Sequence, residues 1–231
     1  MRFLALLRKE LREGLPWILL AAVALLTIGG FSLRHAVVYK IYDWSRSYFT
    51  SGSVVYSNCL THHTPLHITS SALFLTIIGL GLVLGVRQFW LPYFTGTWPF
   101  LIHRSTGRIT IIAAKFTAAA LGFIISPGLI WAVFFWYASR PGLSTPPPAL
   151  RTFIEGWLFI LLGLVIYLGT ALVGLSTARW YTTKIFALAF ATIAVIIVFM
   201  QWNLIMAFAL IIASAAILLL QIIDTFLKRE F

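Results

Sequence analysis

The sequence predicts an all-α membrane protein, with a single transmembrane domain that covers residues 1–231. Hydrophobic residues make up 61% of the 231 positions, and charged residues make up only 10%. Apolar runs of about 17 residues or more recur along the chain, and a helix of that length can cross the hydrocarbon core of a bilayer. No stretch is polar enough to form a separate aqueous domain, so we expect a body embedded in the membrane.

Six membrane spans are predicted from the lengths of the apolar runs. They cover residues 15–33, 69–89, 109–138, 153–175, 185–200 and 204–223. The last two form one nearly unbroken run that is too long for a single crossing at about 1.5 Å per residue. A helical hairpin that turns at Gln201, Trp202 and Asn203 fits this run. A re-entrant pair that does not cross fully is the alternative.

An amphipathic helix is predicted over residues 1–14, ahead of the first span. Its apolar residues share one helical face, opposite the charged residues, and they are Phe3, Leu4, Leu7, Leu11 and Leu15. Such a helix lies in the membrane interface, and Pro16 fits a bend into the first span because proline lacks a backbone donor. A basic flank that only fixes orientation is the simpler alternative. No small-residue cleavage site follows, so we expect the first span to be retained.

Lysine and arginine residues are divided unevenly between the two sides of the predicted spans. Of the 17, twelve fall on the side of both termini and of the segment between spans two and three, and five fall on the other side. The positive-inside rule therefore predicts cytoplasmic termini in a plasma or inner membrane. The net charge of +11 is explained by this topology, and nucleic acid is not expected as a partner.

The longest outer loop is predicted over residues 34–68 and holds the residues best suited to bind a metal: Cys59, His62, His63 and His67. Imidazole and thiolate groups bind transition metals well, but this spacing matches no strong metal template. No metal site is assigned, and a scaffold with a metal-binding outer loop stays an alternative function.

The chain lacks the groups that would power transport or catalysis. Its six acidic residues lie near span ends or in loops, so no carboxylate is expected at mid-membrane for ion exchange. No glycine-rich phosphate loop ending in Gly-Lys-Ser or Gly-Lys-Thr is present. We therefore expect no enzyme activity in this chain, and energy for transport would come from a partner.

Two short segments carry a pattern that is known from one family. The first reads Leu7-Arg8-Lys9-Glu10-Leu11-Arg12-Glu13 and precedes a span. The second follows span two and places a Gly-Thr pair, apolar residues, arginines and then an aliphatic run with a lysine at matching spacing; these are Gly96, Thr97, Leu101, Arg104, Arg108, Ile109 and Lys115. Together they resemble the type-2 ABC transporter permeases, the membrane subunits of many ABC exporters.

The resemblance implies a fold of six transmembrane helices preceded by an interfacial helix, and a permease that works with a separate ABC ATP-binding subunit. ATP and Mg would bind to that partner, and no cofactor would bind to this chain. A second permease subunit, identical or related, would complete the pathway. The substrate is not implied. An ATP-independent channel or carrier is the alternative.

The resemblance also implies which residues contact the ATPase. Residues 90–108 would form the cytoplasmic coupling segment, with contacts from Phe94, Gly96, Thr97, Phe100, Leu101, Arg104 and Arg108. The N-terminal interfacial helix would lie against the same partner and contribute Arg8, Lys9, Glu10, Arg12 and Glu13.

Overall fold

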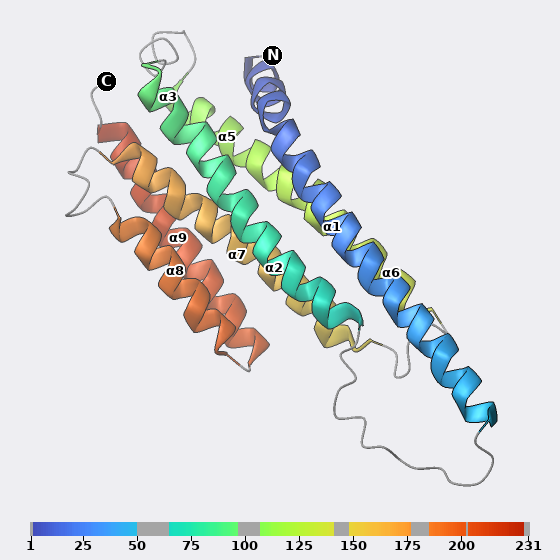
Figure 1. The fold of residues 1–231 in the computed structure, drawn as a ribbon. Coiled ribbons are helices and arrows are strands. Elements are labelled where there is room, and N and C mark those ends of the chain that lie inside the picture. The colour runs from blue at the N-terminus through green and yellow to red at the C-terminus, as the bar shows by residue number, and fades with distance from the viewer. Residues whose placement is uncertain are drawn as a thin grey trace.

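The computed structural model describes residues 2–49, 65–96, 107–140, 148–176, 185–201 and 203–228, which form helices and the turns beside them (Figure 1). In chain order these are α1 (Arg2–Phe49), α2 (Pro65–Gly85), the π-helical turn η1 (Val86–Trp90), α3 (Leu91–Phe94), α5 (Arg108–Phe123), the π-helical turn η2 (Ile124–Gly128), α6 (Leu129–Ala138), α7 (Leu150–Leu175), α8 (Phe186–Phe199) and α9 (Leu204–Lys228). No strand occurs in these ranges, so the all-α fold class is confirmed for them.

Within the residues that the structure describes, five helical stretches are long and apolar enough to cross a membrane: Phe3–Arg34, Thr69–Trp90, Ile109–Ala138, Leu150–Leu175 and Leu204–Leu227. They correspond to five of the six predicted spans, and the chain is therefore a helical membrane protein. The remaining predicted span is α8, which has 14 residues. At about 1.5 Å per residue, α8 is shorter than a hydrocarbon core of about 30 Å. A full crossing by α8 stays a prediction.

α8 and α9 form the hairpin predicted from their nearly continuous apolar run. The two helices pack against each other and are joined at the turn after Phe199 (Figure 1). The side-chain oxygen Oδ1 of Asn203 accepts a hydrogen bond from the backbone N–H of Ile205 at 3.0 Å. This bond caps the start of α9, because the first N–H groups of a helix have no partner within the helix.

α1 is one helix of 48 residues, where an interfacial helix, a bend and a first span were predicted. Pro16 lies inside it, and Figure 1 shows that the first turns, near the N-terminus, run in a different direction from the rest. The bend has a local cause, since Pro16 offers no N–H to the carbonyl of Arg12. The location of residues 1–14 in the membrane interface stays a prediction.

The far end of α1 differs from the predicted loop boundary at Arg34. The apolar stretch ends at Arg34, but the helix continues to Phe49, into the segment predicted as outer loop. Neither glycine nor proline occurs in residues 31–49, so no local signal ends the helix where the hydropathy falls. Loss of hydropathy marks the end of a span, and it does not mark the end of a helix.

α7 forms the buried centre of the bundle, between α2 and the α8–α9 hairpin (Figure 1). Glycines allow α2 and α7 to approach until their backbones touch. A Cβ atom added to Gly81 would lie 2.5 Å from the carbonyl oxygen of Gly163, and one added to Gly163 would lie 2.0 Å from Cγ2 of Ile77. Close backbone contact of this kind stabilises helix pairs in membranes, where apolar burial gives little driving force.

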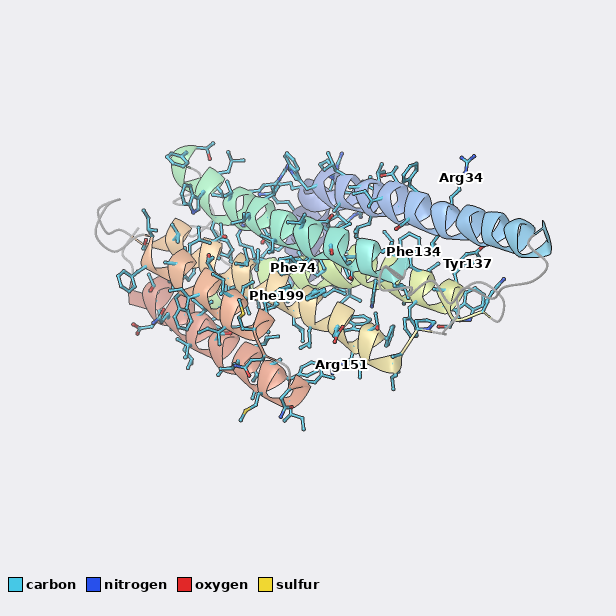
Figure 2. The ribbon with its side chains drawn as sticks, turned by 60° about the horizontal axis from the view of Figure 1, so that its bottom comes forward. Arg34, Phe74, Phe134, Tyr137, Arg151 and Phe199 are labelled. Carbon is cyan, nitrogen blue, oxygen red and sulfur yellow. The ribbon has the colours of Figure 1, made fainter. Side chains whose placement is uncertain are left out.

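An aromatic cluster joins α2, α7 and α8 about two helical turns before Gly81. Figure 2 shows Phe74 of α2 and Phe199 of α8 beside each other, and their ring centroids are 5.5 Å apart. The ring of Phe159 on α7 lies 5.3 Å from that of Phe74. α2, α7 and α8 therefore share both backbone and ring contacts.

Two glycines two residues apart test the close contact between α2 and α7. Gly81→Ala should lower the free energy of unfolding by about 1–3 kcal/mol, because the new methyl group meets backbone atoms that cannot move aside. Gly79→Ala is the matched control, since nothing lies within 4 Å of its added Cβ. That variant should be neutral or more stable by up to about 1 kcal/mol. Unfolding in mixed micelles, followed by circular dichroism, measures both, and equal losses would contradict the contact.

Candidate functional site

Four polar side chains from four helical elements meet inside the bundle, and we call them the polar cluster: Glu10, Gln88, Lys115 and Tyr167. Lys115 on α5 donates from Nζ to Oε1 of Glu10 on α1 at 2.8 Å, and to the backbone oxygen of Gln88 in η1 at 3.0 Å. Tyr167 on α7 donates its hydroxyl to Oε1 of Gln88 and lies 3.4 Å from the carbonyl oxygen of Lys115. The polar cluster therefore joins α1, η1, α5 and α7.

The charges in the polar cluster are removed from solvent. The side chains of Lys115 and Glu10 are only 3% and 7% exposed, and Gln88 and Tyr167 are also buried. The ring of Phe89 covers the ammonium group, with its centroid 5.7 Å from Nζ of Lys115. A buried charge is tolerated only when it is paired and hydrogen-bonded, and the polar cluster provides both conditions.

Local helix geometry brings these groups together. Lys115 lies seven residues after Arg108, at the start of α5, so about two helical turns carry it into the bundle. On α1, Gly14 follows Glu10 by one turn, and Leu84 of α2 packs beside it. Gln88 lies in the π-helical turn η1, where the inserted residue leaves one carbonyl without its usual partner in the helix.

The polar cluster lies at the base of the predicted coupling segment, residues 90–108. Trp90 ends η1 and donates from Nε1 to the carbonyl oxygen of Thr170 on α7 at 3.3 Å. α3 then leads to Phe94, whose side chain is 68% exposed, and to Gly96, which has a φ of +63°. A glycine in this left-handed region commonly ends a helix. Both termini lie at this end of the bundle (Figure 1).

The other residues predicted to contact the ATPase are placed only in part. Thr97, Phe100, Leu101 and Arg104 lie outside the described residues, and Arg108 is the first residue of α5. The five charged residues predicted on the N-terminal helix separate into two groups. Glu10 is buried in the polar cluster, whereas Arg8, Lys9, Arg12 and Glu13 are exposed.

Sequence reasoning placed Glu10 and Lys115 in separate segments and missed their pairing. One signal was available, because Lys115 is the only charged residue in the span 109–138, and a charge inside a span needs a partner. The identity of that partner was not available, since 105 positions separate Glu10 from Lys115. Gln88 and Tyr167 gave no signal at all.

The free-energy cost of breaking a contact differs among the contacts of the polar cluster. Removing one partner from a buried ion pair costs about 3–5 kcal/mol. A hydrogen bond from a charged group to a carbonyl, as from Lys115 to Gln88, contributes about 1.5–3 kcal/mol, and a neutral one, as from Tyr167, contributes about 1 kcal/mol. Separating α1 from α5 would therefore cost more than separating either from η1 or α7 at these groups, because it would leave two buried charges unpaired.

No group of three histidine, cysteine, aspartate or glutamate side chains that could hold a metal occurs in the ranges given above for the structure. Cys59, His62 and His63 lie outside those ranges, and the side chain of His67 is not described. No protein-family model, curated protein or solved structure matches this chain.

The ion pair can be tested with a double-mutant cycle. Glu10→Gln and Lys115→Met should each lower the free energy of unfolding by about 3–5 kcal/mol, because each leaves a buried charge without its partner. The double variant should lose less than the sum of the single losses. The exposed pair of Lys9 and Glu13, 3.8 Å apart, is the matched control, and Glu13→Gln should cost less than about 0.5 kcal/mol. Additive losses in the Glu10–Lys115 cycle would show that the two charges do not interact.

Proposed function

We propose that this chain is the permease subunit of an ATP-binding cassette transporter. It lies in the plasma or inner membrane, with both termini in the cytoplasm. A separate ATPase subunit binds ATP and Mg and docks on residues 90–108. A second permease subunit completes the pathway, and the pair exports a substrate across the membrane.

The polar cluster is the observation that carries this proposal. Gln88 lies two residues before the start of the 90–108 segment, and Lys115 lies seven residues after its end. Both flanks are therefore bonded to each other, to α1 and to the central helix α7. A displacement applied to a segment held in this way is passed to the bundle and is not absorbed by loose flanks. A docking segment that must transmit force needs this property.

The surface beside the polar cluster supports the docking of a partner. Phe94 exposes an aromatic ring at the end of the bundle that also holds the termini, and aromatic anchors dominate the energetics of protein interfaces. Exposed cations on the first turns of α1 include Arg8 and Arg12, and such charges steer and orient an incoming partner.

Passive transport by this chain alone is less well supported. A channel or carrier needs polar groups along a continuous path. Two of the buried hydroxyls are bonded to carbonyls of their own helix instead: Thr170 donates to the carbonyl of Ile166, and Ser214 donates to that of Ile211. These bonds leave such groups less available to line a pathway.

The docking role of the 90–108 segment can be tested at its two glycines. Gly96→Ala forces a side chain into the left-handed region at a cost of about 1–2 kcal/mol, which corresponds to roughly a five- to thirtyfold loss of affinity for the ATPase. Gly107→Ala is the matched control, because Gly107 has an ordinary φ of −57°. A candidate ATP-binding subunit, chosen from the neighbouring reading frames by its phosphate-binding loop, is the partner to test, with copurification and stimulation of ATP hydrolysis as readouts. Arg104→Ala should weaken both readouts as well.

Two results would overturn the proposed function. One is a wild-type chain that, purified and reconstituted alone, transports solute at full rate without nucleotide. The other is unchanged ATPase binding and stimulation in both Gly96→Ala and Arg104→Ala.

A further inference from the structure

We infer that the first turns of α1 and the adjoining half of the third span move together as one rigid lever. The hinges at which this lever moves relative to the rest of the bundle are at Pro16 and Pro127. The lever comprises residues 2–15 of α1 and all of α5 (Arg108–Phe123). The frame on which it moves comprises α2, α7, α8 and α9.

The residues beside the two prolines are in contact, although the prolines belong to different spans. Ser126, immediately before Pro127, donates its hydroxyl to the carbonyl of Ile18, two residues after Pro16, at 3.1 Å. The side chain of Ile18 also fills the space beside Gly122, where an added Cβ would lie 2.9 Å from its Cδ1 atom. α1 and the α5–η2–α6 helix therefore carry their discontinuities at the same depth.

Each discontinuity is a point of low bending resistance. Proline removes one backbone hydrogen bond from a helix, and its ring crowds the preceding turn. In the third span the chain adjusts through the π-helical turn η2 (Ile124–Gly128), and turns of this kind often occur where helices bend in function. The frame has no proline in the interior of a helix, because none lies within α7, α8 or α9, and in α2 only the first residue, Pro65, is a proline. The π-helical turn η1 extends α2, at the end from which the 90–108 segment starts.

The bonds within the lever are stronger than those between the lever and the frame. The buried ion pair of Glu10 and Lys115 lies inside the lever, on the same side of both prolines. Lever and frame are connected by the hydrogen bonds of Gln88 and Tyr167 and by apolar packing, in which Phe123 of α5 lies against Gly163 of α7. Within the frame, the backbones of Gly81 and Gly163 touch. Bending at the prolines would therefore leave the ion pair intact and shift the contacts between lever and frame.

The lever gives the proposed function its moving part, because α5 begins where the 90–108 segment ends. That use of the lever rests on the proposed function. The motion itself needs no ATPase, so it is tested on the chain alone.

The test measures distance distributions by pulsed electron paramagnetic resonance, on spin-labelled full-length chain in lipid nanodiscs with Cys59→Ser as background. Three pairs of exposed positions are labelled after substitution by cysteine: Arg8 with Ile109 within the lever, Arg8 with Phe186 between lever and frame, and Leu75 with Ile196 within the frame. In the otherwise unaltered chain, the distribution between lever and frame should be at least about twofold wider than the other two.

Variants then identify the hinge and the ion pair. Pro16→Ala combined with Pro127→Ala should narrow the lever–frame distribution to the width of the frame pair. Pro65→Ala, in the first turn of α2, should leave all three unchanged, since proline is tolerated there. Glu10→Gln should widen the distribution within the lever, and the charge exchange Glu10→Lys with Lys115→Glu should restore it. The Leu75–Ile196 pair reports whether each variant remains folded.

Three outcomes would overturn the inference. The first is a lever–frame distribution as narrow as that of the frame pair in the chain with both prolines. The second is a lever-internal distribution as wide as the lever–frame one. The third is an unchanged width of the lever–frame distribution in a folded variant that carries both Pro16→Ala and Pro127→Ala. If that variant unfolds, the first two comparisons, made in the chain with both prolines, still decide.

Discussion

The buried ion pair between Glu10 and Lys115 is the interaction on which the arrangement of this protein depends. A lysine two turns inside an apolar span must find an acid, or its burial opposes folding. In this chain the acid comes from the first turns of the N-terminal helix. The pair therefore fixes where the chain begins relative to its third span. It also brings Gln88 and Tyr167 to the same point, which joins the second span and the central helix to it.

A second constraint acts on the other side of the bundle. Apolar burial provides little force between helices in lipid. α2 and α7 are held by close backbone contact at Gly81 and Gly163, and both contact α8 through the rings of Phe74, Phe159 and Phe199. One half of the bundle is thus joined by packing over a long surface. The other half is joined by the buried ion pair and by the contacts of Ile18 with Gly122 and Ser126, and it is interrupted by proline. This difference in how the two halves are held is the basis for dividing the molecule into a frame and a lever.

The function we propose follows from the same division. A permease driven by an external ATPase must receive force at its surface and deliver it to the membrane interior, without chemistry of its own. The polar cluster joins the two flanks of the segment predicted to receive that force, and the helical discontinuities at Pro16 and Pro127 lie deeper in the bundle. Force applied at the surface would therefore be passed inward and released as bending at the prolines.

Local composition along the chain was enough to predict the fold class, most of the spans and one turn. Apolar run length gave the helical membrane class and five of the spans, and the polar break at Gln201–Asn203 gave the hairpin turn, because helix formation and burial in lipid depend on residues that are close along the chain. The outer end of α1 was predicted too early, at Arg34, because hydropathy indicates where a span leaves the membrane. It does not indicate whether the helix continues beyond that point. The packing of the helices alone determines that Glu10 pairs with Lys115 and that Ser126, beside Pro127, bonds to Ile18, close to Pro16. Such pairings depend on how spans far apart in sequence pack, and helical periodicity carries no information about which partner a buried charge will find.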